Sequence, residues 1–163
     1  MKNKLKWMMA VGMLSCSVAM AQQQSDILSV AASTNMENAA LAFDKNAKTM
    51  WTLPSQALKS GQWLMFTIQQ PGDVYELDLQ MQGISKKELK DVLDIFVTYD
   101  PMNLGNPIDY QILGNEKLMK VKFVAPKYGA HVRLDFKPGK LDKPFSLKEI
   151  SVLLAEKVLK DNK

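Results

Sequence analysis

The chain has 163 residues, of which 47% are hydrophobic and 23% charged, and its 21 basic against 17 acidic residues give a formal net charge of +4. This length suits one domain with a sizeable core, and a single cysteine excludes a disulfide within the chain. Three of the lysines stand in the first six residues, so the positive balance is partly local and does not indicate nucleic-acid binding.

Residues 1–21 are predicted to be a signal peptide. Three lysines precede an apolar run over residues 7–20, and Ala19-Met20-Ala21 has the small-x-small pattern of a signal-peptidase site. The run is shorter than the roughly 20 residues that a membrane-spanning helix needs. Cleavage after Ala21 would leave 142 of the 163 residues, with 18 basic and 17 acidic side chains and a net charge of +1.

Export to the periplasm, the medium or the cell surface is therefore expected. Lipidation at Cys16 is the alternative, but Leu14 and Ser15 occupy positions where a lipobox has small residues. No second apolar stretch is long enough to span a membrane.

The rest of the chain is dominated by strands. Residues 22–28 are interpreted as a linker, residues 29–154 as one domain and residues 155–163 as a polar tail. Alternating or continuous apolar patterns predict strands over residues 63–68, 74–81, 93–99, 119–123, 131–136 and 149–154. Frequent Pro, Gly and Asn turn signals separate them, so we expect an all-β antiparallel sandwich or barrel.

Helix is a minor component of this prediction. Residues 36–43 are expected to form one or two turns. Residues 85–93 are expected to form another short helix, because Ser85 and Glu88 have the spacing of a capping box.

Three segments in order resemble one family. "AFDKNAKTMW" (42–51) resembles the A-x-D-G-N-x-x-T-x-W turn of discoidin domains, also called coagulation factor V/VIII C-type domains, whose galactose-binding-like fold includes the family 32 carbohydrate-binding modules. "SGQWLMFTIQQPGDVYELDLQM" (60–81) and "FSLKEISVLL" (145–154) are similar to the next strands and the closing strand. The resemblance implies a β-sandwich of jelly-roll type.

The resemblance also implies a structural calcium ion. By position, the ion's ligands would be Asp44, Asn46, Thr49 and Glu149, with Trp51 packed beneath them. Oxygen donors of this kind suit calcium. The family's glycine after the aspartate is Lys45 here, which would cost about 1 kcal/mol if the position needs a positive φ. The alternative is that the turn persists as structure without a metal.

Catalysis is not supported by the sequence. The only histidine, His131, lies on the polar face of a predicted strand, and there is no Gly-x-Ser-x-Gly turn. Two distant carboxylates could still meet in space, which keeps a hydrolase as a remote alternative.

Candidate ligand-binding residues are few. The loops where sugar-binding relatives place aromatic and polar groups offer only Phe145, Gln80, Gln82 and Lys86 here. Phe145 could equally belong to the core, and Trp51 and Trp63 are both expected in the core.

Charge is uneven along the chain. Residues 73–116 carry nine acids and three lysines, and residues 117–148 carry nine basic residues and two acids. Outward-facing Lys120, Lys122 and Arg133 could form a basic stripe for an anionic glycan. The alternative, which we favour, is cross-strand pairing with acids such as Glu76 and Asp78.

These observations predict an exported, non-catalytic binding protein whose ligand is a cell-surface or dietary glycan. The alternative is a protein-interaction or adhesion subunit that uses the same fold. The expected partner is thus a glycan or a protein at the cell surface, with calcium as a structural cofactor and neither nucleic acid nor a membrane span involved.

Overall fold

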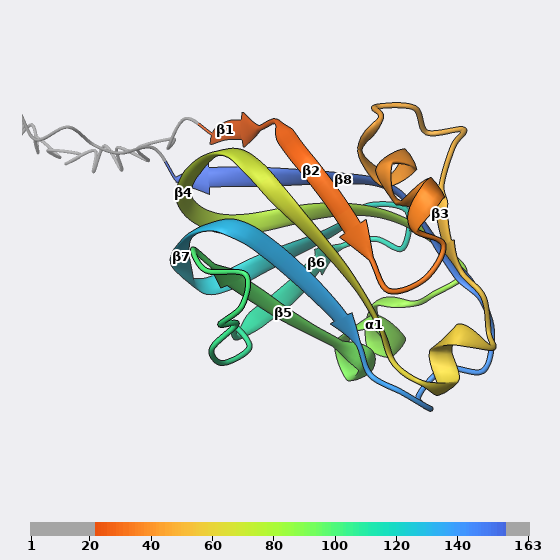
Figure 1. The fold of residues 1–163 in the computed structure, drawn as a ribbon. Coiled ribbons are helices and arrows are strands. Elements are labelled where there is room, and N and C mark those ends of the chain that lie inside the picture. Colours follow the sequence, from red (N-terminus) through yellow and green to blue (C-terminus); the bar gives the residue numbers. More distant parts are fainter. Residues whose placement is uncertain (1–21, 156–163) are drawn as a thin grey trace, which may run out of the picture.

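The computed structural model describes residues 22–155, and Figure 1 shows its strands and helices. The predicted signal peptide and residues 156–163 of the predicted tail lie outside the described residues. The elements in chain order are β1 (Gln22–Ser25), β2 (Ile27–Ala32), η1 (Met36–Phe43), β3 (Trp51–Leu53), η2 (Ala57–Lys59), β4 (Gln62–Gln82), α1 (Lys86–Val92), β5 (Leu93–Thr98), β6 (Tyr110–Gly114), β7 (Met119–Phe136) and β8 (Phe145–Ala155).

Two long, bent strands hold the sandwich together. The first half of β4 pairs with the second half of β7. Strand β2 lies on the other side of β4 and β5 on the other side of β7, which makes one sheet in the order β2-β4-β7-β5. The remaining halves pair with each other between β8 and β6, and β1 and β3 pair with β8 to complete the second sheet. All pairs are antiparallel, so the predicted antiparallel β-sandwich is confirmed.

Strands β4 and β7 both bend at a corner where they pass from one sheet to the other, and two predicted turns are wrong there. The turn signals at residues 71–73 and 125–127 do not end strands but bend them, as the left side of Figure 1 shows. Gly72 and Gly129 face each other there. A Cβ on Gly129 would lie 2.7 Å from Val97 Cγ1 and 2.8 Å from the Thr98 carbonyl oxygen, so glycine is required where the strands approach closely.

The predicted linker over residues 22–28 is also wrong. Its residues form β1 and open β2, and β1 pairs with β8 from Gln22 opposite Ala155 to Ser25 opposite Val152. The sequence Gln-Gln-Gln-Ser has no apolar alternation to signal a strand, because an edge strand needs only backbone hydrogen bonds to its neighbour.

Both short helices are found where the sequence places them. Residues 36–43 form the 3₁₀ helix η1. Helix α1 begins after Ser85, whose hydroxyl accepts a hydrogen bond from the Glu88 N–H (3.3 Å), while the Glu88 carboxylate accepts from the Ser85 N–H (2.8 Å). The predicted capping box is therefore confirmed.

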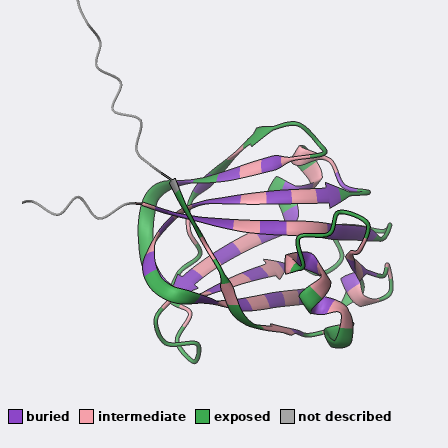
Figure 2. Cartoon of the chain, turned by 90° about the horizontal axis from the view of Figure 1, so that it is seen from above, coloured by how far each residue is buried: buried purple, intermediate pink, exposed green. Residues whose placement is uncertain are grey.

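The core fills the space between the two sheets, and Figure 2 shows buried and less buried residues alternating along the strands. Trp51 is fully buried, as expected, and its indole N–H lies 3.2 Å from the carbonyl oxygens of Thr34 and Asn35. The Phe136 ring contacts both Trp51 and Phe145, with centroid distances of 6.4 and 5.1 Å. Within residues 22–155, no helix is long and apolar enough to cross a membrane.

Candidate functional site

The Asp44 turn is closed by its own side chains. One carboxylate oxygen of Asp44 accepts a hydrogen bond from the Asn46 N–H (2.9 Å), and the other lies 2.6 Å from the Thr49 hydroxyl. The same hydroxyl lies 2.7 Å from the Asn46 carbonyl oxygen. Three of the predicted metal ligands thus form one compact turn between η1 and β3.

Lys45 adopts the left-handed conformation in this turn, with φ at 58°. The position where the family resemblance has glycine therefore does need a positive φ, which a lysine adopts at a cost. The Lys45 ammonium lies 3.5 Å from the Asp26 carboxylate, and both side chains are about 70% exposed (73% and 71%). This positive charge is consequently held at the surface by Asp26.

Glu149, the fourth predicted metal ligand, comes from strand β8. Its Oε2 atom is buried and accepts no hydrogen bond from any residue between positions 22 and 155. Burial raises the pKa of the Glu149 carboxyl above its ordinary value and the Asp44 charge adds to the rise, whereas the backbone amide and the charge of Lys45 lower it. A buried oxygen without a donor is costly unless a cation or water satisfies it.

These residues fit a calcium ion in their chemistry. Two carboxylates lie close enough to influence one another, and one of their oxygens lacks a partner among the described residues. No group of three or more histidine, cysteine, aspartate or glutamate side chains in residues 22–155 is arranged to hold a metal. A calcium ion would therefore depend on backbone carbonyl oxygens as well, as it commonly does.

The predicted ligand-binding residue Phe145 belongs to the core instead. It is 2% exposed, pairs with Leu53 across β3 and β8, and packs on Phe136. Because Phe145 opens a strand whose next inward residues are also apolar, its ring is directed between the sheets. It is not available to stack on a sugar.

The other three candidates do not form one site. Gln80 lies opposite Glu149 on the outer face of the second sheet and lines a hollow beside it. Gln82 lies at the end of β4, and Lys86 donates from α1 to the Gly114 carbonyl oxygen (2.8 Å). Only Gln82 among them lines the hollow described next.

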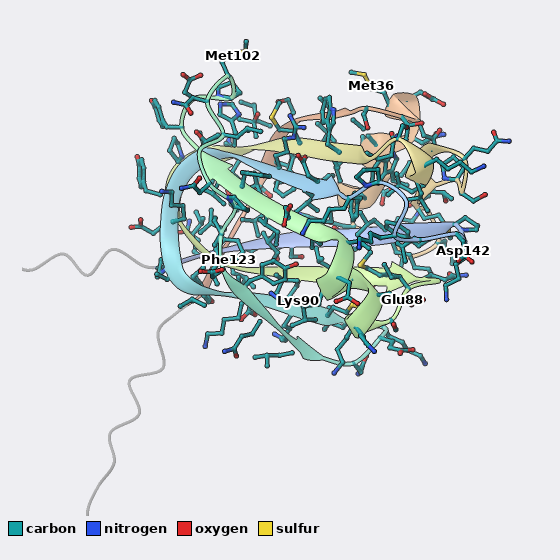
Figure 3. All side chains as sticks on the ribbon, turned by 90° about the horizontal axis from the view of Figure 1, so that it is seen from below. Met36, Glu88, Lys90, Met102, Phe123 and Asp142 are labelled. Atoms are coloured by element: carbon teal, nitrogen blue, oxygen red, sulfur yellow. The ribbon has the colours of Figure 1, made fainter. Side chains whose placement is uncertain are left out.

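A hollow of about 520 Å³ lies at the end of the sandwich that carries α1. We call it the loop-end hollow. Figure 3 shows Glu88 of α1 and Asp142 of the loop before β8 at this end, away from Met102. The lining residues are Met81, Gln82, Gly83, Ile84, Ser85, Glu88, Glu116, Lys117, Lys143 and Pro144.

The charges at the loop-end hollow include a fixed pair. Lys143 lies 3.0 Å from Glu88. Hydrogen bonds from the backbone and hydroxyl of Ser85, together with Lys143, lower the pKa of Glu88 to about 2. Amide, carboxylate and ammonium groups side by side can bind hydroxyl groups, although no aromatic ring from residues 22–155 lines this hollow.

The predicted basic stripe is not a single surface. Lys120 lies opposite Asp78 in the second sheet and is 3.4 Å from Glu76 and 3.6 Å from Asp78. Lys122 lies on the same sheet, opposite Glu76, whereas Arg133 lies in the first sheet beyond the corner of β7. The favoured alternative, cross-strand pairing, is confirmed for Lys120.

Sequence reasoning placed Trp63 in the core, and this expectation is wrong. Trp63 is half-buried on the outer face of the first sheet, where Arg133 lies 4.8 Å above its ring. Leu64, Phe66 and Ile68 point inward. Every second residue from Gln62 to Ile68 is buried, whereas Trp63, Met65 and Thr67 between them are only half-buried. The sequence hides this alternation, because Trp63 and Met65 make the run almost continuously apolar.

No protein-family model matches the chain, and a comparison with curated proteins gives no match. Solved structures do match. The family 32 module of AlyQ in complex with 4,5-unsaturated mannuronic acid is 20% identical, with a TM-score of 0.58 over 80% of this chain and 97% of that chain. The family 32 module from NanJ of C. perfringens in complex with galactose is 14% identical, with a TM-score of 0.62 over 82% and 99%.

A longer structure, truncated AlyQ with CBM32 and alginate lyase domains, is 19% identical, with a TM-score of 0.61 over 83% of this chain. The present chain spans only 34% of that protein. The similarity to these structures confirms the predicted fold, the discoidin-like sandwich of family 32 carbohydrate-binding modules.

Proposed function

We propose that the protein is an exported, non-catalytic carbohydrate-binding module. The observation that carries this proposal is the loop-end hollow, in which Gln82, Glu88 and Lys143 present amide, carboxylate and ammonium groups at one end of a family 32-type sandwich. Sites for small ligands are concave and hold a few convergent polar groups. The similar structures named above include modules in complex with galactose and with an unsaturated mannuronic acid.

The chemistry of the hollow favours binding over catalysis. A pKa of about 2 keeps Glu88 ionised at neutral pH, and its charge is paired with Lys143. A general acid needs a pKa near the working pH, so Glu88 is unsuited to donate a proton. His131 lies on the outer face of the first sheet, where its Nδ1 is 3.0 Å from the Thr67 hydroxyl.

A structural calcium ion is part of the proposal. Asp44 and Glu149 would supply carboxylates, and Asn46 and Thr49 would supply backbone carbonyl oxygens. The unpartnered Oε2 of Glu149 supports this assignment. When bound, the ion would join the turn after η1 to strand β8 and neutralise two nearby acids.

One observation supports the alternative, a protein-interaction subunit. Tyr99 and Tyr128 stack with centroids 6.5 Å apart and planes 16° apart, and they are 66% and 48% exposed. Met102 is 91% exposed in the loop after β5, at the end of the sandwich opposite the loop-end hollow. Exposed aromatic and methionine side chains are enriched where proteins dock.

A glycan array tests the proposal, with wild type and the variants Gln82→Ala and Lys143→Ala compared in calcium and in chelator. We expect wild type to bind at least one glycan family and both variants to bind it about tenfold more weakly, because each loses a polar contact worth about 1.4 kcal/mol. Tyr99→Ala is the control. An array without any signal above background would contradict the proposal.

Export is tested by the intact mass of the protein purified from its native host. Cleavage after Ala21 leaves a chain that begins at Gln22. A mass that includes residues 1–21, or a diacylglyceryl adduct on Cys16, would show that the signal-peptide interpretation is wrong.

A further inference from the structure

We propose a second saccharide site on the outer face of the first sheet, centred on Trp63 and specific for a neutral pyranose. The inference rests on the proposed glycan-binding function and adds a place and a ligand class to it. Its residues come from β4, β5, β7 and the turn after β7, and none of them lines the loop-end hollow.

Strand register brings apolar and polar side chains together on this face. Trp63 lies opposite Asp135, and Met65 lies opposite Arg133. Across the next pair of strands, Arg133 lies opposite Phe96 and Asp135 opposite Asp94. Successive side chains in a strand point to opposite faces, so these residues all face away from the core, and Trp63, Met65, Phe96 and Arg133 are each only half-buried.

A hollow of about 310 Å³ opens at the Trp63 end of this face. We call it the Trp63 hollow. Trp63 supplies an indole, Asp94 and Asp135 supply carboxylates, and Arg133 and Lys137 supply cations. An aromatic side chain beside several hydrogen-bonding groups is the composition expected of a small-ligand site.

Two ion pairs fix the polar groups in place. Arg133 donates through Nε to Asp135 Oδ1 (2.5 Å) and through Nη2 to Asp135 Oδ2 (3.2 Å), which is a bidentate arrangement. Lys137 lies 3.0 Å from Asp94. The Arg133 guanidinium also lies over the Trp63 ring, at 4.8 Å from its centroid, so the cation–π contact and the fork restrain the ring and the donors together.

This pairing decides the class of ligand. The two cations and two carboxylates of the Trp63 hollow are paired with one another, so the hollow has no excess charge for an acidic sugar. A uronate carboxylate would have to displace Asp135 from Arg133 and leave it without its partner. Hydroxyl groups both donate and accept, so a neutral sugar can bind paired ions without separating them.

The face of a pyranose complements the remaining surface. Its C–H groups are apolar and would pack on the exposed part of the Trp63 ring that the Arg133 guanidinium leaves uncovered, while its equatorial hydroxyl groups would reach Asp135 and the free N–H groups of Arg133. A half-buried tryptophan of this kind lies outside the core on an open sheet face, where an aromatic side chain is more often found at an interface than on plain surface.

Isothermal titration calorimetry tests the inference with tetrasaccharides of galactose, glucose, mannose and xylose, and with tetragalacturonic acid as the acidic probe. The variants are Trp63→Ala, Trp63→Phe, Arg133→Met and Asp135→Asn. Tyr99→Ala is the matched control, because it removes an exposed aromatic ring just beyond the end of β5, whereas the Trp63 hollow lies at the start of that strand, at Asp94. Melting temperatures of all variants identify any that fail to fold. If Trp63→Ala fails to fold, Trp63→Phe still tests the site, because it keeps an aromatic ring of smaller area.

We expect wild type to bind at least one neutral probe more tightly than tetragalacturonic acid. Trp63→Ala and Asp135→Asn should weaken that affinity about tenfold or more, and Trp63→Phe by less, because a smaller aromatic face remains. Raising the salt concentration from 50 to 500 mM should change the affinity by less than about twofold, since no net charge is involved.

Two results would overturn the inference and leave the proposed function intact. One is a neutral probe whose binding is lost in Gln82→Ala or Lys143→Ala and unchanged in Trp63→Ala. The other is a preference for tetragalacturonic acid that Arg133→Met removes. Failure of wild type to bind any saccharide, on the array as well as in calorimetry, would instead contradict the proposed function itself.

Discussion

At the scale of single residues, Lys45 shows how a turn persists with an unfavourable side chain. The hydrogen bonds among Asp44, Asn46 and Thr49 close the turn and hold Lys45 at a φ of 58°. Left-handed backbone costs a lysine energy that glycine avoids. The exposed ion pair with Asp26 offsets little of this, because such pairs contribute at most about 1 kcal/mol.

Lys45→Gly is therefore expected to stabilise the fold. Removing the Cβ penalty outweighs the greater freedom of glycine in the unfolded chain, and the net gain should be about 0.5–1 kcal/mol, or about 2 °C in melting temperature. Thermal unfolding in chelator measures it. Lys45→Ala is the control, since it removes the ion pair but keeps the strain; equal stabilisation of both variants would show that the charge, and not the backbone, is responsible.

Local turn and cap structure was predicted better than the burial of individual side chains. The Asp44 turn and the capping box can be predicted from short patterns, because each depends on groups a few residues apart, whereas the burial of Trp51 was expected from the family resemblance. Phe145 and Trp63 were misplaced for the opposite reason. Which face of a strand is buried depends on the second sheet, and a continuous apolar run leaves that undecided.

At the scale of elements, α1 depends on its first turn. The seven-residue helix is too short to be stable by itself, so the capping box and the buried Leu89 and Val92 must hold it to the sandwich. The Glu88 carboxylate contributes through Ser85 and Lys143, which lower its pKa from 4.5 to about 2.

This pKa predicts a pH dependence for Glu88→Gln. A carboxyl group whose pKa is lower in the folded state stabilises the fold above its unfolded pKa, and this contribution is lost as the pH falls through the folded value. Wild type should therefore be more stable than the variant above pH 4.5, and the difference should shrink as the pH falls towards about 2. Urea unfolding at several pH values measures it, with Glu116→Gln as the control. A difference that stays constant down to pH 3 would contradict the assignment.

The segments of β4, β5, β7 and β8 were predicted, but the continuity of β4 and β7 was not, and β1, β2, β3 and β6 were missed. The patterns over residues 63–68 and 74–81 are two halves of β4, and those over residues 119–123 and 131–136 are two halves of β7. Pro and Gly between the halves read as turns, whereas here they bend paired strands from one sheet into the other. Close packing of Gly129 on Val97 and Thr98 is a tertiary contact that no local pattern reveals.

At the scale of the whole molecule, three lysines of the basic block pair with acids of the acidic block, namely Lys120, Lys137 and Lys143. Strand β7 carries basic residues beside the acids of β4 in the second sheet, and its corner separates Lys122 from Arg133. The residues of the predicted stripe are therefore divided between the two sheets, and Lys120 and Arg133 are each paired with a carboxylate, which is why the neutral-ligand proposal replaces the anionic stripe.

Calcium is expected to stabilise the whole fold if Asp44 and Glu149 hold it as proposed. At about 100 times its dissociation constant, the ion should add about 2.7 kcal/mol, or roughly 5–10 °C in melting temperature. Asp44→Ala should abolish this difference, and Glu149→Gln, which preserves the side-chain shape, should do so without disturbing the turn. An unchanged melting temperature on adding calcium to chelator-treated protein would leave the turn as structure alone.

The central claim, that this sandwich binds a saccharide, is tested most directly by an NMR titration of ¹⁵N-labelled protein with the neutral tetrasaccharides. We predict that the Trp63 indole N–H signal, assigned with Trp63→Phe, shifts in a saturable manner with at least one of them. The Trp51 indole signal should stay fixed, because that ring is fully buried and hydrogen-bonded to the backbone. A spectrum in which no signal moves with any of the saccharides at millimolar concentration would contradict the account.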